Sequence, residues 1–430
     1  MSRTRTLFIV LPKRQSGVIA MLILFIVAVV AISFLVSSLK SSTSQTERDK
    51  ITAAALAQAK AGLIGFAASV ELSGCTSSNN CPRPGELPCP DTNDDGQAES
   101  SCGKADGSTG QVNRLGRLPW KTLGLPDLRD GYGERLWYAV SNSFKNNFRA
   151  LPLNSDTLGT INVRDPNGTT IADFAAGTGA AAIIFSPGAP LTRQDGVVQD
   201  RSPSGNNNPI NYLDIANGED NQNFVDKLSN GFIQGPIKNA SNSVILNDTL
   251  ITISRDDIMR VVEKRVAAEV INALGSGSFP KPAAFNDSSC LGSAAILVNC
   301  NSAPSTNPDR GRIPANPSPP WGVNAGFLNG ISTSWFQQNA WREVIYYTIG
   351  LLTLNNPPAA AITGRNALVI MAGAALANQN RAANKLLETN YLEDENSSSP
   401  LDDTYTIRPV ISTTPFNDKV RCLLGSPPQC

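Results

Sequence analysis

The stretch that decides the fold is Lys13-Arg14-Gln15-Ser16-Gly17, followed by residues 18–39, VIAMLILFIVAVVAISFLVSSL. The second segment has 22 residues and no charged side chain, which is enough for a helix to cross a bilayer core about 30 Å thick. Four basic residues and no acid precede it: Arg3, Arg5, Lys13 and Arg14. Because positive charge stays on the cytoplasmic side, we expect residues 18–39 to form a single transmembrane helix with a cytoplasmic N-terminus. The rest of the chain would then be exported.

The length of this apolar segment distinguishes it from a secretory signal peptide, whose apolar region has about 7–15 residues and ends in an Ala-x-Ala-like site. Two interpretations stay open, an uncleaved signal anchor and a leader that is removed at Gly17. The basic residues, Gly17 and the helix-like continuation through residues 41–68 resemble the type IV pilin and type II secretion pseudopilin family. In that family a prepilin peptidase cuts after such a glycine, so the resemblance implies cleavage between Gly17 and Val18.

One position departs from the family pattern. Most members carry a Glu five residues into the mature chain, where this chain has Leu22. A carboxylate in lipid is costly and is kept for a partner, so a chain without it resembles minor subunits at a filament tip, such as the K-type pseudopilin or the X-type minor pilins. The resemblance implies a low-copy, non-enzymatic inner-membrane subunit with a periplasmic bulk. Its partners would be other minor pilins or pseudopilins, the inner-membrane assembly platform and prepilin peptidase.

A function of a different class stays open beside this one. A signal-anchored periplasmic binding or adhesion protein would keep the membrane segment, residues 18–39, and would never enter a filament. Removal of residues 1–17 separates the two interpretations, because it is expected of the filament subunit and not of the simple anchor.

Composition narrows the function further. The 430 residues contain 36 Lys plus Arg and 36 Asp plus Glu, so the formal net charge is zero. With no basic run beyond the leader, nothing indicates nucleic-acid binding. The chain has no His, which excludes a Ser-His-Asp triad and His-based acid–base catalysis and removes the commonest zinc ligand. We therefore expect no enzymatic activity.

The eight cysteines all follow the membrane segment, and each has a near neighbour in sequence: Cys75 and Cys81, Cys89 and Cys102, Cys290 and Cys300, Cys422 and Cys430. An even number in an oxidising compartment indicates disulfides. Pairing between these neighbours is the simplest connectivity, which the sequence alone does not establish. The first four lack the Cys-x-x-Cys spacing of zinc sites, which disfavours a metal cluster.

Two helices are expected in the exported part. The first has apolar residues every three or four positions: Ile51, Ala55, Ala59, Leu63, Phe66 and Val70. The second begins at Ser254, because Ser is a good N-cap and Asp256 and Asp257 favour the positive end of a helix dipole. It would end at Gly275, and its expected apolar residues are Ile258, Val261, Val262, Val266, Val270, Ile271 and Leu274.

The second half of the exported part repeats landmarks of the first half in the same order. After a loop with Cys290 and Cys300, the corresponding segments are 116–119 and 311–314, 135–140 and 344–349, 182–191 and 367–376, 211–213 and 390–392, and 248–252 and 403–407. We interpret them as two tandem copies of one helix-plus-sheet unit, residues 40–253 and 254–430. The alternative is one larger α+β domain with coincidental strand similarity.

The predicted fold is therefore α+β. A leader, residues 1–17, and a transmembrane helix, residues 18–39, would lead into a pilin-like helix packed on an antiparallel sheet, with a second pilin-like unit after it. Asp130-Gly131-Tyr132-Gly133, before the strand-like Trp137 and Tyr138, is similar to the turn-then-strand element of pseudopilin sheets. Its glycines would permit the tight turn.

The best candidate site is Asp91-Thr92-Asn93-Asp94-Asp95-Gly96-Gln97-Ala98-Glu99. It has the spacing of the front of a calcium loop, with five candidate ligands: Asp91, Asn93, Asp95, Gln97 through its backbone carbonyl, and Glu99. The Glu expected at the twelfth position is replaced by Cys102. Pseudopilins are known for calcium-stabilised loops, so the resemblance favours calcium; a plain acidic turn is the alternative. Two other acidic segments, 393–395 and 402–403, are expected to be solvated loops.

Overall fold

The structure is a computed structural model that describes residues 44–73, 75, 80–103, 114–147, 149, 151–203, 206–223, 231–275, 279–292, 297, 299–303, 309–331, 333–397, 402–407 and 415–423. The expected leader and transmembrane helix, with Gly17 and Val18, lie outside the described residues. Within the described part the chain is a mixture of helix and mainly antiparallel sheet, as the sequence predicts for an α+β fold.

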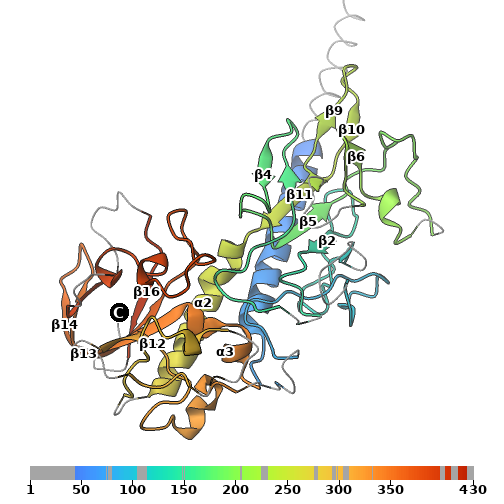
Figure 1. Ribbon diagram of the computed structural model, residues 1–430. Helices are drawn as coiled ribbons and strands as arrows, with labels where there is room; N and C mark the ends of the chain where they lie inside the picture. The colour runs from blue at the N-terminus through green and yellow to red at the C-terminus, as the bar shows by residue number, and fades with distance from the viewer. Residues whose placement is uncertain are drawn as a thin grey trace, which may run out of the picture.

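The first described element is the helix Ser44–Ser69, drawn in blue in Figure 1. One side of it is buried at positions that follow the helical repeat: Thr52, Ala55, Leu56, Ala59, Leu63 and Ala67. The predicted apolar face is confirmed in its middle. At its start Ile51 is 44 % exposed, and Val70 lies beyond the helix end.

Among the described residues, Ser44–Ser69 is the one helix long and apolar enough to cross a membrane, judged by length and composition alone. A core helix of a soluble protein passes the same test, and this helix packs one side into the protein core. The helix is consistent with a single-pass anchor near the N-terminus.

This helix lies against a four-stranded antiparallel sheet in the order β1-β2-β5-β11. The strands are β1 (Leu115–Arg117), β2 (Trp137–Val140), β5 (Ala182–Ser186) and β11 (Thr249–Ile253). Neighbouring residues of a strand face opposite sides, so Tyr138 packs in the same core as the helix and Trp137 packs in a second core. Figure 1 shows the helix passing behind these strands.

Loops and short ladders cover the other side of this sheet. They contain β3 (Val163–Arg164), β4 (Thr170–Ala172), the 3-10 helix η1 (Pro209–Asn211), β6 (Ile215–Ala216), β7 (Glu219–Asp220), β8 (Phe232–Ile233), β9 (Ile237–Lys238) and β10 (Val244–Leu246). Aromatic rings fill the space between these loops and the sheet. Tyr212 lies 5.4 Å from Trp137, and Phe232 lies 4.8 Å from Phe185, between ring centroids.

The second long helix, α2 (Arg255–Leu274), begins where the sequence predicts. Ser254 Oγ accepts a hydrogen bond from Asp257 N, and the Asp257 carboxylate accepts one from Ser254 N, which is a reciprocal capping box. The buried residues are Ile258, Met259, Val262, Glu263, Val266, Ala267 and Val270. Val261 is instead 38 % exposed, because the helix turns its Met259 and Ala267 side toward the core.

Helix α2 runs alongside the first helix. Lys60 Nζ lies 2.8 Å from Asp257 Oδ2 and 3.0 Å from the Thr252 carbonyl oxygen. Further along both helices, Arg265 Nη1 donates to the Ala68 carbonyl oxygen at 2.7 Å. Since the later residue of one helix meets the later residue of the other, the two helices run in the same direction.

Helix α2 packs on a second sheet with the order β12-β13-β14-β16. The strands are β12 (Asp309–Arg312), β13 (Ile345–Asn355), β14 (Ile362–Met371) and β16 (Lys419–Cys422), and β15 (Thr404–Thr406) pairs in parallel with the far end of β13. Short helices occupy the connections: η2 (Ser288–Cys290), η3 (Val323–Leu328), α3 (Trp335–Gln338), η4 (Trp341–Glu343), η5 (Glu388–Asn390) and η6 (Asp394–Ser397).

The two four-stranded orders repeat each other, and so do details at their edges. Gly116 lies opposite Tyr138 in the first sheet, as Gly311 lies opposite Tyr347 in the second. Each of these tyrosines donates its hydroxyl to a proline carbonyl oxygen, Tyr138 to Pro88 and Tyr347 to Pro280.

One predicted correspondence is wrong. Residues 403–407 were expected to match residues 248–252, but β15 pairs in parallel with β13, whereas β11 is the antiparallel edge partner of β5. The strand in that position of the second sheet is β16, the antiparallel partner of β14. Asn417-Asp418 therefore corresponds to Asn247-Asp248.

The two halves share one hydrophobic core. A single cluster of buried side chains includes Leu63 from the first helix, Tyr138 from the first sheet, Val266 from α2 and Val369 from the second sheet. The division at Ser254 is thus supported by the repetition alone, since the described residues show continuous apolar packing across it.

Gly311 offers a test of the repeated edge. A Cβ atom at Gly311 would lie 1.9 Å from the Ala283 carbonyl oxygen, a backbone atom that cannot move away without breaking the Ala283–Arg312 bridge. We expect Gly311→Ala to lower the free energy of unfolding by about 1–3 kcal/mol, measured by chemical denaturation. Gly322→Ala is the matched control, because nothing lies within 4 Å of its added Cβ. Equal stability of the two variants would contradict this reading of the close approach.

Candidate functional site

The acidic loop that follows Cys89 is wound around the carboxylate of Asp91. This side chain is buried, and its Oδ1 accepts hydrogen bonds from Asn93 N (3.1 Å) and Asp94 N (2.7 Å). Its Oδ2 accepts one from Gly96 N (2.7 Å), and Gly96 has a φ of 86°, a conformation that glycine adopts without strain. Asp91 thus fixes the first turn of the loop.

The other predicted ligands continue the winding. Asn93 Oδ1 accepts from Asp95 N (2.9 Å), and Asp95 Oδ1 accepts from Gln97 N (2.7 Å). Glu99 turns back toward the loop entrance, where its Oε1 accepts from Thr92 Oγ1 (2.7 Å). The structure brings all five predicted residues into one loop, which its own amide hydrogens hold in shape.

Basic side chains surround this loop. Arg135 Nη1 lies 2.8 Å from Asp94 Oδ1, and Lys121 Nζ donates to the Asp95 carbonyl oxygen. Burial raises the pKa of Asp91, and its amide donors oppose that rise. Oxygen ligands of this kind suit calcium. Within the described residues, however, no group of three or more Cys, Asp and Glu side chains is arranged to hold a metal ion.

A disulfide and a backbone ladder hold the loop in place. Cys89 and Cys102 are bonded at its two ends, with a Cα–Cα distance of 5.6 Å. Asp91 and Arg117 exchange backbone hydrogen bonds of 3.0 and 2.6 Å, which attach the loop to β1.

The structure also contains the other expected neighbouring disulfides that it describes in full, Cys75–Cys81 and Cys290–Cys300. Cys422 is disulfide-bonded as well, and its expected partner, Cys430, lies outside the described residues.

A pair of buried carboxyl groups, Asp214 and Asp248, was not predicted from the sequence. Asp214 N donates to Asp248 Oδ2 at 2.8 Å, and Asp214 Oδ2 accepts from Asn247 N at 2.7 Å. Asn221 Nδ2 also donates to Asp248 Oδ2, at 2.8 Å. The pair joins the loop after η1 to the start of β11.

The second half has the same arrangement in Glu393 and Asp418. Glu393 N donates to Asp418 Oδ2 at 2.9 Å, and Glu393 Oε2 accepts from Asn417 N (3.0 Å) and Asp418 N (2.9 Å). Asn396 Nδ2 donates to Asp418 Oδ2 at 3.1 Å. Glu393 was expected in a solvated acidic segment, which is wrong because it faces this buried partner; Asp402 and Asp403 are exposed, as expected.

The sequence carries a signal for these pairs. The first acid of each pair follows a Gln-x-Arg segment and then an Asn-Tyr-Leu segment. The glutamine of the Gln-x-Arg segment donates to that acid, Gln199 Nε2 to Asp214 and Gln379 Nε2 to Glu393. An acid follows the Asn-Tyr-Leu segment directly in both halves, Asp214 in the first and Glu393 in the second. The second acid of each pair is distant in sequence, so the contact itself was not predictable from spacing.

Burial dominates the electrostatics of both pairs. It raises the pKa of Asp214 to about 6. It raises the pKa of Asp248 well above the ordinary range, with the nearby Asp214 carboxylate adding to the effect. In the second half, burial and the neighbouring Glu393 raise the pKa of Asp418 in the same way.

The two halves also meet at a polar contact between loops. Asn154 Nδ2 donates to the Asn339 carbonyl oxygen at 3.0 Å. Asp156 Oδ1 accepts from Arg381 Nη1 at 2.6 Å and from Ala375 N at 3.1 Å. A loop of the first half thereby holds a loop of the second.

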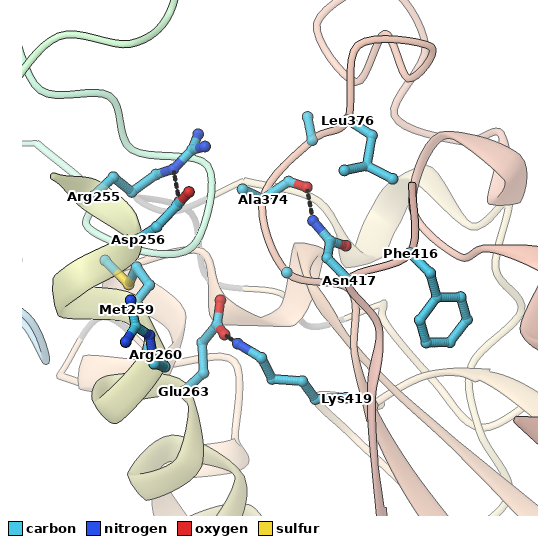
Figure 2. A pocket seen from close by; sticks show the side chains of 12 residues that line it. Arg255, Asp256, Met259, Arg260, Glu263, Ala374, Leu376, Phe416, Asn417 and Lys419 are labelled. Carbon is cyan, nitrogen blue, oxygen red and sulfur yellow. Dashed lines mark hydrogen bonds and ion pairs between the residues drawn. The ribbon is translucent and has the colours of Figure 1, made fainter. Parts of the chain in front are cut away.

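Beside this contact lies a cleft of about 770 Å³ lined by residues of both halves, among them Asp156, Arg381, Glu343 and Lys385. The ionic side chains in its wall are paired, Asp156 with Arg381 and Glu343 with Lys385. A smaller groove of about 400 Å³ continues from it between α2 and the loops around Ala374 and Asn417 (Figure 2). Together they form a continuous hollow lined by both apolar and charged side chains.

Comparison with known proteins identifies no relative for this chain. No family model, no curated protein and no solved structure matches it.

Asp156 tests the contact between the halves. Asp156→Ala removes the partner of the buried Arg381 guanidinium and one acceptor for Ala375 N, so we expect the free energy of unfolding to fall by about 1.5–3 kcal/mol. Chemical denaturation of the purified chain measures it. Asp403→Ala is the control, because Asp403 is exposed; a loss no larger than in this control would show that the contact does not stabilise the fold.

Proposed function

We propose that this chain is a non-enzymatic minor pseudopilin- or pilin-like subunit. Residues 18–39 would anchor it in the inner membrane, with the bulk in the periplasm, and it would join a type II secretion pseudopilus or a type IV pilus near the tip. The observation that carries the proposal is the helix Ser44–Ser69, which follows the charge-free segment closely and packs one side on an antiparallel sheet.

The other side of this helix supports assembly with neighbouring subunits. It is exposed along the whole helix and carries small side chains, among them Ala53, Ala57 and Ala61. Small residues allow close approach of helix backbones. Such a surface suits packing among the helices of other minor subunits once the anchor leaves the membrane.

The exported halves would supply the recognition surface of the subunit. Because they share one core and are joined by Asn154 and Asp156, they would present the cleft between them as one rigid body. We propose that this surface contacts other minor subunits or a secreted protein.

We also propose that the Asp91 loop binds calcium. Asp91, Asn93, Asp95 and Glu99 would supply oxygen ligands, with the backbone carbonyl of Gln97. Bound calcium would offset the repulsion among three carboxylates and would lower the raised pKa of Asp91. The missing twelfth-position Glu implies weak binding, in the range of extracellular modules at about 0.1–1 mM.

Processing at Gly17 tests the filament assignment. We expect the mature chain to begin at Val18, and Gly17→Val to leave a longer, membrane-retained precursor, because the peptidase would no longer find its small residue. The measurement is mass spectrometry of the N-terminus from cells that contain a prepilin peptidase. The control is Gly65→Val, a glycine of the helix with nothing within 4 Å of an added Cβ, which should be processed normally.

Identical chains starting at Met1 in wild type and Gly17→Val would reject the pilin-like assignment. The simple signal-anchored periplasmic binding or adhesion protein would then stand.

Thermal melting of the purified chain tests calcium. At a few millimolar calcium, a site of this strength would stabilise the first half by about 1–2 kcal/mol through mass action, so its melting temperature should rise relative to a chelator. Asp91→Ala combined with Asp95→Ala should abolish the rise, whereas Asp402→Ala with Asp403→Ala should keep it. An unchanged wild-type melt at several millimolar calcium would reduce the loop to a disulfide-closed acidic turn.

A further inference from the structure

We propose that the two buried acid pairs, Asp214–Asp248 and Glu393–Asp418, each hold one proton at neutral pH. Each pair would then be a pH-sensitive link between a loop and an edge strand, present once in each half of the exported part. Alkaline pH would release the proton from each pair and loosen both sheets. The inference is independent of the proposed function, since it depends only on contacts within the fold.

The two acids of each pair hold each other by reciprocal hydrogen bonds. In the first half, the backbone of Asp214 donates to the side chain of Asp248, and the side chain of Asp214 accepts from the backbone beside Asp248. In the second half, Glu393 and Asp418 exchange hydrogen bonds in the same two directions. These reciprocal hydrogen bonds hold the two carboxyl groups of each pair close together in the interior.

Hydrogen-bond donors reach only one oxygen of the Asp248 and Asp418 carboxyl groups among the described residues. Asp248 Oδ2 accepts two N–H bonds, and Asp418 Oδ2 also accepts two. The other oxygen of each group, Oδ1, is fully buried with no hydrogen-bond partner among the described residues. A charge delocalised onto a buried oxygen that has no hydrogen-bond partner is costly, which favours the neutral form of the Asp248 and Asp418 carboxyl groups.

Two arginines lie near the first pair, and both donate to other groups. Arg193 donates to the Leu213 carbonyl oxygen and pairs with Asp195 and Asp220. Arg201 donates to carbonyl oxygens and pairs with Glu134. Both guanidinium groups thus donate their hydrogen bonds to other groups. Within the described part of the chain, the side-chain hydrogen bonds to the pair come from the neutral amides of Gln199 and Asn221.

The cationic side chains near the second pair are likewise bonded to other groups. Arg381 donates to the carbonyl oxygens of Asn390 and Gly373 and pairs with Asp156 of the first half. Lys419, next to Asp418, pairs with the buried Glu263 of α2 (Figure 2). The neutral amides of Gln379 and Asn396 complete the pair.

The pairs lie where they control the sheet edges. Asp248 immediately precedes β11 and Asp418 immediately precedes β16, and each of these strands is the last in its sheet. Loss of the proton leaves two negatively charged carboxylates side by side in the interior, which disfavours the folded state. The edge strands would therefore loosen first, in both halves together.

The direction with pH follows from proton linkage. In the unfolded chain these acids have ordinary pKa values near 4, whereas burial and the neighbouring carboxyl group raise the pKa of Asp248 and that of Asp418 in the folded state. The folded state therefore binds more protons as the pH rises above the unfolded values. The stabilisation is complete below the unfolded values and is lost as the pH rises through the folded values. The exported part should therefore be more stable at mildly acidic than at alkaline pH.

The test uses the full chain in mild detergent. The folding equilibrium constant from chemical denaturation should fall at least about tenfold between pH 6 and pH 8.5, because each proton retained by the folded state contributes about tenfold per pH unit. Asp248→Asn with Asp418→Asn keeps the shape of the side chains and removes the titrating proton. The logarithm of the folding equilibrium constant should then fall by less than half of the wild-type change over the same pH range. Asp402→Asn with Asp403→Asn changes two exposed acids and should leave the wild-type dependence unchanged.

Infrared spectroscopy of the wild-type chain supplies a second measurement that needs no variant to fold. A carboxylic-acid carbonyl band at pH 7.5 that disappears on alkaline titration supports the proposal. Absence of the band overturns it, and so does an equal pH dependence of stability in the wild type and the Asp248→Asn, Asp418→Asn variant.

Discussion

The structure depends on the burial of two helix faces against two sheets in one continuous core. Ala59 and Leu63 of the first helix and Val262 and Val266 of α2 are completely buried in it. Apolar burial supplies the main favourable term in folding, and here it is not divided between independent modules. The polar contacts at Lys60 and Arg265 set the helices side by side, so each sheet forms against a surface that the other half helps to position.

The sequence predicted the features that depend on near neighbours. Ser254 and Asp257 make the expected cap, and the neighbouring cysteines of the described part are bonded. It failed where contacts join distant segments. The match of residues 403–407 to β11 was wrong because strand order depends on pairing and not on spacing. Glu393 was predicted to be solvent-exposed because its partner, Asp418, is distant in the sequence.

The candidate loop shows the same division. Asp91 and Asn93 each accept a hydrogen bond from the backbone amide two residues later, a contact between near neighbours. The basic side chains that surround it, Arg135 and Lys121, come from later segments. In the second half Ala283 lies against Arg312 as Asp91 lies against Arg117, so the acidic loop is a feature of the first half only.

A single residue, Ser254, separates strand β11 from helix α2. A duplicated protein with a flexible linker could swing its outer half on a hinge, but this junction has no slack. The end of β11 is also held through Thr252 by Lys60 of the first helix. Because of these contacts, a force on the second half would act on the first helix as well, rather than bend the junction between them.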